Sequence, residues 1–355
     1  MLIFKIIQNR LLQQFLLIAI ISGQDLENLS FGDDISLDIA TWNIEWFPKN
    51  SHVTVDYVSE IISSLDIDII AIQEIDDTTM FNHMLDSMPG YSGYYESSWF
   101  AGLGFIYKSD VIAINDIYEI YTTSEFWNAF PRSPMVMDLT FMDENYFIIN
   151  NHLKCCGDGI LNLNDASDEE NRRFIAMNYI KEYVDNYLPN QNVFVLGDLN
   201  DDISELSSNN IFQNILSDSS NYIFADMEIA QGDPLDWSFP NWPSHLDHIL
   251  ITNELFNGVN VFEVQTIKID EYMTGGWSEY DQNISDHRPV AIKIFISSLV
   301  IYDINADGAI DQFDFVLLLE SILNENTSNE LMDIDTDSSV DIYDLYLLID
   351  FMQSI

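Results

Sequence analysis

The sequence predicts a layered fold of mixed strands and helices over residues 34–296, followed by a small all-α unit over residues 301–355. Two observations carry this prediction. In the first region, apolar runs of strand length alternate with segments whose apolar residues recur at helical spacing. In the second region, two acidic blocks are each followed by one apolar helix. The alternation is typical of α/β and α+β domains, in which helices cover the faces of sheets.

Strands of the first region are expected where short apolar runs are bounded by turn residues. The expected strands are 35–47, 67–75, 103–107, 135–141, 146–151, 192–196, 246–252, 261–269 and 289–296. Helices are expected where apolar residues recur every three or four positions, which are the ranges 53–65, 80–88 and 168–187. Several of these strands end in polar residues, so we expect chemistry in the loops that follow them.

The chain is strongly acidic, with 12 Lys and Arg residues against 59 Asp and Glu residues and a formal net charge of -47. Its 355 residues, 47% of them apolar, are enough for about two domains with a sizeable core. So much negative charge keeps a protein soluble and repels polyanions. It counts against tight, nonspecific nucleic-acid binding, which depends on contacts between phosphate and Lys or Arg. We attribute it to the surface of an exported or salt-exposed protein.

The N-terminus has the pattern of a secretory signal peptide over residues 1–23, followed by an N-terminal extension over residues 24–33. Lys5 and Arg10 precede an apolar stretch at 11–21, and the small residues Ser22 and Gly23 follow it. The apolar stretch is too short to span a membrane comfortably. We therefore expect a secreted, extracellular protein with no membrane span in the mature chain.

The two cysteines, Cys155 and Cys156, are adjacent. Neighbouring Cα atoms lie about 3.8 Å apart, which is below the usual range for a disulfide. The sequence leaves two alternatives open. The pair consists of two thiols in a loop, or of a strained vicinal disulfide that stiffens the loop after His152.

Two acidic blocks in the C-terminal region, 303–314 and 333–344, have the spacing of a calcium-binding loop. Such loops place oxygen ligands at alternate positions and close the shell at position 12. The oxygen-bearing residues at positions 1, 3, 5, 9 and 12 are Asp303, Asn305, Asp307, Asp311 and Asp314 in the first block and Asp333, Asp335, Asp337, Asp341 and Asp344 in the second. Gly308 suits the sharp turn at position 6, where the second block has Ser338. Two blocks with one spacing predict two Ca²⁺ sites.

Residues 301–355, joined through a linker at 297–300, resemble a type I dockerin. The resemblance rests on the two loops and on the apolar helices 315–323 and 345–352 that follow them. It implies Ca²⁺ binding and a cohesin-type protein partner, through which the chain would be attached to a cell surface. The side chains that would meet this partner lie late in the loops and are Gln312, Phe313, Ile342 and Tyr343.

Three oxygen-bearing side chains at predicted strand ends, Asn43, Glu74 and Asp286, form a candidate site for Mg²⁺ or Mn²⁺. Magnesium is usually bound by one or two carboxylates together with waters and substrate phosphate oxygens. A cation held in this way polarises a phosphoryl oxygen and offsets charge in the transition state.

Five further residues are candidates for catalysis. His287 titrates near neutral pH, and Asp247 can accept its second N–H and fix the tautomer. Asp198 and Asn200 lie two positions apart after a strand and are expected to orient the water or to bind phosphate. His152 is expected to donate to a phosphoryl oxygen or to assist the leaving group. Two other histidines, His245 and His248, flank Asp247, and the sequence leaves their role open.

Residues 34–296 resemble the endonuclease/exonuclease/phosphatase superfamily and its deoxyribonuclease-like members. The segments that carry the resemblance, in the family's order, are Trp42-Asn43-Ile44-Glu45, Gln73-Glu74, Asn151-His152-Leu153, Gly197-Asp198-Leu199-Asn200, Leu246-Asp247-His248 and Ser285-Asp286-His287. The resemblance implies a four-layer sandwich of two central β-sheets flanked by helices. It implies metal at Asn43, Glu74 and Asp286, and the Asp247–His287 pair as the base.

Two further residues are assigned through the same resemblance. Arg132 precedes a strand where secreted deoxyribonucleases place a phosphate-binding arginine. Glu96 is expected to pair with His152.

Together these features predict a secreted, metal-dependent phosphodiesterase, most simply a nuclease, attached to a dockerin. The alternatives are a phospholipid phosphodiesterase of the sphingomyelinase type and a catalytically silent binding module. The sequence lacks a run of Lys and Arg that would hold a polynucleotide, because Lys154, Arg172, Arg173 and Arg288 are scattered. It does not distinguish DNA from RNA, endonuclease from exonuclease action, or one cohesin partner from another.

Overall fold

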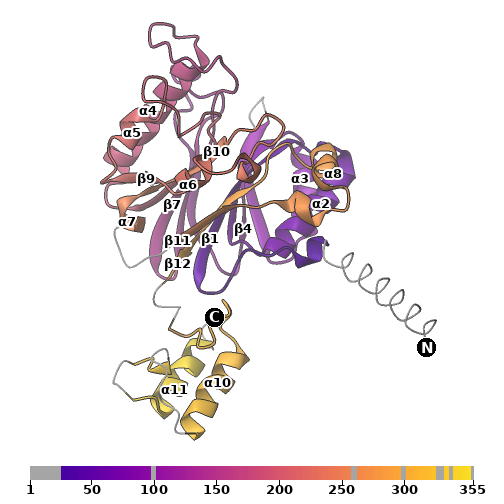
Figure 1. Cartoon of the computed structure of the whole chain (residues 1–355), viewed down its shortest axis with the longest axis vertical. Coiled ribbons are helices and arrows are strands. Elements are labelled where there is room, and N and C mark those ends of the chain that lie inside the picture. Colours follow the sequence, from indigo (N-terminus) through magenta and orange to yellow (C-terminus); the bar gives the residue numbers. More distant parts are fainter. Residues whose placement is uncertain are drawn as a thin grey trace, which may run out of the picture.

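Two six-stranded β-sheets pack face to face in the computed structural model, which describes residues 25–96, 101–256, 262–296, 301–324, 332–335 and 339–352 (Figure 1). The first sheet consists, in spatial order, of β11 (Phe262–Thr266), β12 (Val290–Phe295), β1 (Ser36–Phe47), β2 (Ile69–Ile75), β4 (Gly102–Lys108) and β3 (Tyr91–Glu96). The second sheet consists of β5 (Ala113–Glu119), β6 (Met135–Phe141), β7 (Glu144–His152), β8 (Asn192–Asp198), β10 (Asp247–Thr252) and β9 (Tyr222–Phe224). Both sheets are mixed, because β1 pairs with β2 and β7 with β8 in parallel while their other neighbours are antiparallel.

Helices cover the outer face of each sheet. The helices on the first sheet are α2 (Ser51–Leu65), α3 (Thr78–Asp86) and α8 (Gly276–Asn283), and those on the second are α4 (Glu169–Tyr187) and α5 (Gln213–Leu216). Shorter helical turns in the connections are η1 (Leu26–Asn28), α6 (Met227–Ala230), η2 (Pro234–Asp236), α7 (Asn253–Phe256) and η3 (Ile269–Tyr272). The order of layers is therefore helices, sheet, sheet, helices, which agrees with the predicted fold class.

The alternation of side chains along β1 shows how the layers are filled. Ile39 points into the core between the sheets, where it joins Phe105 and Phe194. Trp42 points the other way and belongs to the core beneath α2. Because successive side chains of a strand face opposite sides, a strand covered on both faces is apolar along its whole length. The unbroken apolar runs of the sequence therefore correspond to the central strands.

The sequence analysis missed three strands. β3, β5 and β9 lie at sheet edges; the first two carry half-buried or exposed residues, and the third has only 3 residues. Edge strands lack the strong apolar pattern of strands buried on both faces. The expected strand at 261–269 was also too long, because the chain leaves the sheet after Thr266 and turns into η3.

One glycine allows the two parallel strands of the second sheet to approach closely. Gly197 has φ +138°, and a Cβ at this position would lie 1.9 Å from the carbonyl oxygen of Asn151. Any other residue would force β7 and β8 apart. The close approach fixes the position of Asp198, the next residue.

The C-terminal unit contains α10 (Gln312–Leu323) and α11 (Ile342–Met352) and contacts the start of β1. The Asp34 N–H donates to the Gly308 carbonyl oxygen at 2.9 Å. Ile35 belongs to the same apolar cluster as Leu318 and Leu348 of the two helices. The unit is thus packed against the end of the sandwich where β1 begins.

The predicted signal peptide at 1–23 and the linker at 297–300 lie outside the described residues. The extension before β1 is described from Asp25, and its side chains Leu26, Leu29 and Phe31 are buried against the first sheet's core. None of the helices in the described ranges is long and apolar enough to cross a membrane.

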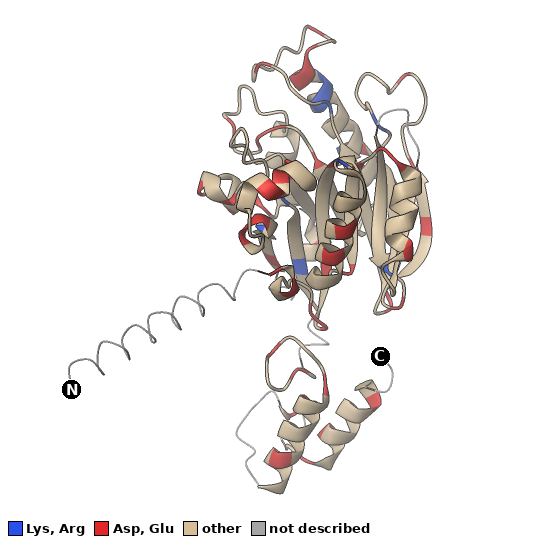
Figure 2. Ribbon diagram, turned by 90° about the vertical axis from the view of Figure 1, so that its right-hand side faces the viewer, with Lys and Arg blue, Asp and Glu red and all other residues tan. Residues whose placement is uncertain are grey.

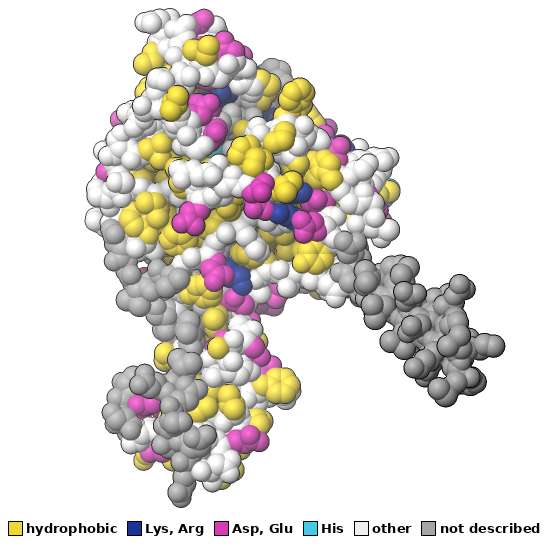
Figure 3. Space-filling view, in the orientation of Figure 1, with side chains coloured by type: hydrophobic (Ala, Val, Ile, Leu, Met, Phe, Trp, Pro, Cys, Tyr) yellow, Lys and Arg dark blue, Asp and Glu magenta, His cyan; other side chains and the backbone are white. Residues whose placement is uncertain are grey.

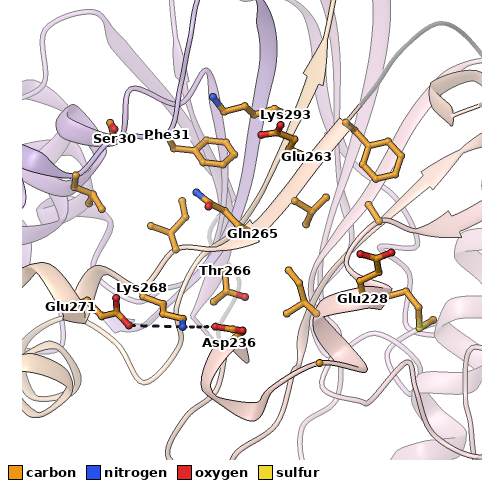
Figure 4. Close-up of a pocket in the computed structure, with 18 of the residues that line it drawn as sticks. Ser30, Phe31, Glu228, Asp236, Glu263, Gln265, Thr266, Lys268, Glu271 and Lys293 are labelled. Atoms are coloured by element: carbon orange, nitrogen blue, oxygen red, sulfur yellow. Dashed lines mark ion pairs between the residues drawn. The ribbon is translucent and has the colours of Figure 1, made fainter. Parts of the chain in front are cut away.

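A trough of about 1200 Å³ opens between the edge strands β9 and β11 (Figure 4). Lys268 lies at this trough and forms ion pairs with Asp236 and Glu271. No predicted site residue lines the trough. It is therefore separate from the candidate active site.

Candidate active site

The registers of the second sheet align three predicted residues in one row. His152 at the end of β7 lies opposite Asp198 at the end of β8, and Asp198 lies opposite Asp247 at the start of β10. In the first sheet, β1 and β2 run in parallel, so Asn43 and Glu74 reach the same edge. Five segments that are distant in the sequence therefore meet at one end of the sandwich.

Asp198 is at the centre of this cluster. Its Oδ2 accepts a hydrogen bond from Asn43 Nδ2 at 3.0 Å, and His152 Nε2 lies 3.4 Å away and His287 Nε2 3.8 Å away. Glu74 joins through its Oε1, which accepts from Asn43 Nδ2 at 3.3 Å and lies 3.8 Å from His152 Nε2. The structure thus brings five predicted residues into direct contact.

His287 and Asp247 form a buried pair. His287 Nδ1 lies 2.7 Å from Asp247 Oδ2, and the Asp247 side chain is fully buried. Because a carboxylate only accepts, Nδ1 carries a proton and Nε2 faces Asp198. Burial opposes the charge on His287, but Asp247 and Asp198 outweigh it and raise the pKa of His287 to about 10.

The pKa of the Asp198 carboxyl is also raised, but here burial is the main cause. Burial raises it, His287 lowers it, and Asp247 raises it again, which brings the pKa of Asp198 to about 7. Asn200 lies beside this group, because its N–H donates to Asp198 Oδ1 at 3.1 Å. Its backbone has φ +55°, a left-handed conformation that asparagine tolerates better than most residues.

His152 and Arg132 lie next to each other at the site. Burial lowers the pKa of His152 well below its usual value, and Arg132 and then His287 lower it further. Arg132 donates from Nε to the Ala101 carbonyl oxygen at 2.9 Å. Burial lowers the pKa of Arg132, while the charges of Glu74 and Asp198 act in the opposite direction. The charges of the cluster therefore act on the predicted phosphate-binding arginine.

Glu74 is held in a strained conformation at a bulge in β2. Its φ is +69°, and the register of β2 with β4 shifts between Gln73 and Ile75. Glu74 Oε2 accepts from the Trp46 N–H at 3.0 Å. A bulge redirects one side chain, and positive φ at a residue other than glycine costs on the order of 1–3 kcal/mol. Such a cost is typical of a residue whose direction matters for function.

Asp286, the third predicted metal ligand, lies 3.9 Å from His287 Nε2 through its Oδ1. Its N–H donates to Glu45 Oε2 at 2.8 Å, and Glu45 also pairs with Lys49. The sequence analysis did not assign Glu45 a role. Burial raises the pKa of Glu45, Lys49 lowers it, and the nearby Asp286 raises it. The position of Glu45, two residues after Asn43 on the same strand, was the signal that could have found it.

The donor set fits a hard divalent cation. Glu74, Asp198 and Asp286 offer carboxylate oxygens, which are the ligands that Mg²⁺ and Mn²⁺ prefer. Asn43 turns its Nδ2 to the cluster in this structure, while its Oδ1 accepts from the Glu45 N–H at 3.0 Å. Burial is the main cause of the raised pKa of Asp198, and the negative charges of Asp247 and Glu74 add to the repulsion around this carboxylate. A bound cation would relieve this repulsion.

The expected pairing of Glu96 with His152 is wrong. Glu96 is exposed at the end of the edge strand β3, and its Oε2 accepts from the Tyr94 hydroxyl at 3.3 Å. His152 Nδ1 is buried and has no hydrogen-bond partner within the described ranges of the chain. Edge placement keeps the Glu96 carboxylate in solvent, away from the histidine.

The open question about His245 and His248 is resolved by a second buried cluster with Asp226. Asp226 Oδ2 lies 3.0 Å from His245 Nε2 and 2.6 Å from His248 Nδ1. The Ser238 N–H donates to His245 Nδ1, so the ring proton of His245 is on Nε2. His248 Nε2 lies 2.9 Å from the Asp201 carbonyl oxygen. Both nitrogens of His248 therefore face acceptors, and both carry protons.

The pKa shifts of Asp226 and His248 agree with the hydrogen bonds, because they favour a charged carboxylate beside a charged imidazolium. Burial disfavours the imidazolium, but Asp226 outweighs it and raises the pKa of His248. Burial likewise disfavours the Asp226 carboxylate, but His248 and His245 lower its pKa well below the usual range. Asp226 and His248 form a buried ion pair, and His245 is hydrogen-bonded to the same carboxylate. We call these three residues the buried histidine cluster.

The loop after β7 holds both cysteines as free thiols. They are exposed, with their Sγ atoms 3.0 Å apart. Arg173 fixes this loop, because its Nη1 donates to the carbonyl oxygens of Lys154 and Cys156 at 2.7 Å each. Of the two alternatives, the structure has the pair of thiols.

The two predicted calcium loops share one pattern of hydrogen bonds. Asp314 accepts from the Asn305 and Asp311 N–H groups, as Asp344 accepts from those of Asp335 and Asp341. In the first loop, Asp303 also accepts from the N–H groups of Asp307 and Gly308. Ligand atoms of Asp333, Asp335 and Asp344 lie within 4.8 Å of one another. Asp337 lies outside the described residues.

A family model for the endonuclease/exonuclease/phosphatase family matches residues 40–287. The chain belongs to this family. Members of the endonuclease/exonuclease/phosphatase family are metal-dependent phosphoric ester hydrolases, so the chain is placed among these enzymes. The match covers every predicted catalytic and metal-binding residue of the first domain.

Solved structures agree with this fold. A zebrafish (D. rerio) TDP2 complexed with single-strand DNA product is 13% identical, with a TM-score of 0.58 over 74% of this chain and 100% of that chain. The human Nocturnin catalytic domain with bound sulfate is 16% identical, with a TM-score of 0.55 over 75% and 97%. A mannosyl-6-phosphatase of Bacteroides thetaiotaomicron is 16% identical, with a TM-score of 0.51 over 74% and 100%. A search of curated proteins finds no significant sequence match.

Proposed function

We propose that the chain is a secreted, divalent-metal-dependent phosphodiesterase that hydrolyses nucleic acid. The observation that carries this proposal is the contact of Asp198 with Asn43, His152 and His287, which joins residues of both sheets around one carboxylate. The cluster combines oxygen ligands for a cation with imidazole and guanidinium donors for a phosphate. Among structures of this fold, the zebrafish TDP2 was solved in complex with a single-strand DNA product, which supports nucleic acid as the substrate class.

Asn43, Glu74 and Asp286 would hold Mg²⁺ or Mn²⁺. The cation supplies Lewis-acid polarisation of the phosphoryl oxygen and offsets charge in the transition state. The remaining residues bind phosphate and move protons.

The proton steps follow from the two abnormal pKa values. With a pKa of about 7, Asp198 can take a proton from the attacking water near neutral pH. His287, with a pKa of about 10, is protonated at that pH and donates to the phosphate through Nε2. In place of the Asp247–His287 base that the resemblance implies, we assign the base to Asp198 and the proton donor to His287.

Phosphate binding is assigned to Arg132, His152 and Asn200. Arg132 is attracted by the charges of Glu74 and Asp198 and would pair with a phosphoryl oxygen bound at this cluster. His152 has a lowered pKa and is neutral, so it donates a hydrogen bond without adding charge. Asn200 is fixed beside Asp198 and can orient the water.

The test measures nicking of supercoiled plasmid by the full chain with Mg²⁺, with and without EDTA. Wild type is expected to nick the plasmid only with metal, and Glu74→Gln is expected to abolish nicking without unfolding the protein. His83→Gln is the matched control, because His83 is an exposed histidine of α3 in ring contact with His52 only. Intact plasmid under all conditions, for a protein that is folded and metal-loaded, would contradict the nuclease proposal.

Phospholipid is the second candidate substrate. Trp127 and Trp242 lie in turns and are exposed by 64% and 78%. Trp46, near the end of β1, is exposed by 52% and donates from its backbone N–H to Glu74 Oε2. Exposed tryptophan near a cleft suits a membrane interface, where an amphipathic ring is stable. Release of phosphocholine from sphingomyelin vesicles, together with intact plasmid, would decide for the phospholipid.

For the C-terminal unit we propose two Ca²⁺ sites and docking onto a cohesin-type partner. The shared pattern of hydrogen bonds at Asp314 and Asp344 supports the sites. Phe313, Ile342 and Tyr343 support the docking, because these apolar side chains are exposed by 61%, 61% and 67%. Calorimetric titration with Ca²⁺ is expected to give two sites in wild type and one in Asp314→Ala. If wild type bound no Ca²⁺, the proposed calcium sites would be wrong.

A further inference from the structure

We propose that the trough between β9 and β11 binds an extended peptide segment of a partner protein, and that this segment carries Lys or Arg. The segment would add to the edge of β11 as a further strand of the first sheet. In such strand addition, backbone hydrogen bonds provide the affinity and side-chain contacts provide the specificity. The proposal does not depend on the phosphodiester chemistry, because no candidate active-site residue lines the trough.

The edge of β11 presents backbone groups to the trough. β11 is the last strand of the first sheet and, among the described residues, pairs with β12 alone. The register places Thr266 opposite Val290, and one residue further the Ile267 N–H donates to the Pro289 carbonyl oxygen at 2.8 Å. In an antiparallel pair, residues that bond to the partner strand alternate with residues whose N–H and C=O point away from it. The backbone groups of Thr266, and of Val264 two residues earlier, therefore point away from β12 toward the trough that they line.

These outward groups are unpaired in the described structure. No hydrogen bond of the Val264 or Thr266 backbone occurs within the described ranges. Thr266 is only 9% exposed, and its Oγ1 is buried without a hydrogen-bond partner among the same residues. Figure 4 shows Thr266 at the trough. A buried hydroxyl without a partner is unfavourable, so it persists where a bound ligand or water completes it.

The opposite wall of the trough has a second sheet edge. The Ala225 N–H donates to the Ile249 carbonyl oxygen at 2.8 Å, so by the same alternation the backbone groups of Phe224 point away from β10. The volume of about 1200 Å³ exceeds the roughly 300–1,000 Å³ of a typical small-molecule pocket. The five residues of β11 span about 17 Å. The trough therefore suits an extended segment of similar length that lies between the two edges.

The lysines of the trough are already neutralised. Lys268 forms ion pairs with Asp236 and Glu271 (Figure 4), and Lys293 pairs with Asp33. A compensated lysine attracts an anionic ligand only weakly. An acidic segment would therefore gain little from these two cations.

Two acidic side chains of the trough remain uncompensated. Glu263 of β11 lies opposite Lys293 of β12, but that lysine pairs with Asp33. Within the part of the chain that the structure describes, neither Glu263 nor Glu228 of α6 forms an ion pair, although both line the trough. A Lys or Arg of a bound segment would supply the missing partner through a charge-assisted hydrogen bond.

The overall charge argues against a second copy of the chain as the occupant. The net charge is -47, and Figures 2 and 3 show how few cationic side chains there are among the acidic ones. Two copies repel each other, whereas a basic segment is attracted. Because this attraction acts over the whole surface, the unpaired backbone groups of β11 are what would select the trough.

The experiment measures binding of a fluorescently labelled peptide of three Lys–Val repeats to the full chain by fluorescence anisotropy. The same peptide methylated at every backbone nitrogen keeps its charge but loses its donors, and it is expected to bind about tenfold more weakly. The unmethylated peptide should also slow amide hydrogen exchange at Val264 and Thr266, because their N–H groups gain partners. If wild type binds this peptide with a Kd above about 1 mM, the proposal is wrong.

Val264→Pro tests the backbone contribution. Proline removes the N–H that points into the trough and leaves the pairing with β12 intact, which is why edge strands tolerate it. The variant is expected to raise the Kd about tenfold. Val264→Ala keeps the N–H and is the matched control, with a change of less than about threefold.

Glu263→Gln tests the charge contribution without altering the backbone, and it is expected to raise the Kd about threefold. Its control is Glu60→Gln, which removes an equal charge from an exposed position of α2 and should leave binding unchanged. Thermal unfolding checks each variant, and if Val264→Pro does not fold, the methylated peptide and Glu263→Gln decide. Equal binding of the methylated peptide, or an unchanged Kd in the folded trough variants, would show attraction by the acidic surface alone and overturn the inference.

Discussion

The catalytic cluster and the buried histidine cluster both place imidazole rings against a buried aspartate, but only one of them satisfies its polar atoms. In the buried histidine cluster, both nitrogens of each ring have a partner, and Asp226 Oδ1 accepts from the Ile249 N–H. In the catalytic cluster, Asp247 Oδ1 and His152 Nδ1 are buried and have no hydrogen-bond partner among the residues that the structure describes.

This difference shows how a functional site is distinguished from a structural one of similar composition. A buried polar atom that lacks a hydrogen bond costs about 1–3 kcal/mol, so it persists where a ligand or water completes it. A cluster in which every atom is paired holds the fold. The candidate active site is therefore expected to trade stability for chemistry, and the buried histidine cluster is not.

The largest effect is expected from His287→Gln. Loss of the proton donor should lower kcat by roughly 10²–10⁴-fold, because general acid–base catalysis contributes that much. Initial rates on a single-stranded DNA 12-mer with Mg²⁺ measure it, and His83→Gln is the control. A variant that keeps more than about a tenth of wild-type kcat would remove His287 from the mechanism.

Asp226→Asn should cost about 3–5 kcal/mol of unfolding free energy, since it leaves the charged His248 without its partner in a fully buried place. Urea titration followed by circular dichroism measures this cost. If the loss were below about 1 kcal/mol, the buried histidine cluster would not be the structural element that its hydrogen bonds indicate.

Asp198→Asn is expected to act in the opposite direction on stability. The folded pKa of Asp198 is raised to about 7, so the stability contributed by its protonated form is present at low pH and lost as pH rises through 7. At pH 8, in EDTA, the amide should therefore increase the unfolding free energy by on the order of 1–3 kcal/mol while abolishing activity. If Asp198→Asn lowered the unfolding free energy, as Asp226→Asn is expected to do, the two clusters would not differ in the way proposed.

The smallest effect is a dependence on pH. Because the folded pKa of His248 is raised above 6.5, its contribution is complete below pH 6.5 and is lost as pH rises through the folded value. The difference in unfolding free energy between wild type and His248→Gln should therefore shrink above pH 6.5, by at most about 1.4 kcal/mol per pH unit. A difference that stays constant from pH 6 to pH 10 would show that His248 is not the titrating group.

Much of the active site was predictable because its residues end long, buried strands. Asp198 and His152 end parallel neighbours, so their meeting follows from strand polarity alone. Asp226 was not predictable, because it lies in a short turn before α6 with no periodic pattern around it. Glu96 was placed wrongly because an edge strand gives no sign of which way its last side chain points.

The charge distribution was the least predictable feature. The sequence shows a net charge of -47 and scattered cations, and nothing in it tells which cations are paired. Lys181 and Arg172 lie on one helix, yet within the part of the chain that the structure describes, Lys181 forms ion pairs with Asp185 and Asp218, whereas Arg172 has no carboxylate oxygen within 4.0 Å. Pairing depends on the tertiary contacts of side chains, which composition and spacing do not specify.

The C-terminal unit and the active site lie at opposite ends of a single strand. Ile35, just before β1, packs on the C-terminal helices, whereas Asn43, further along the same strand, contacts Asp198. Eight extended residues span about 25 Å. A partner bound to the C-terminal unit would therefore leave the candidate active site accessible to substrate.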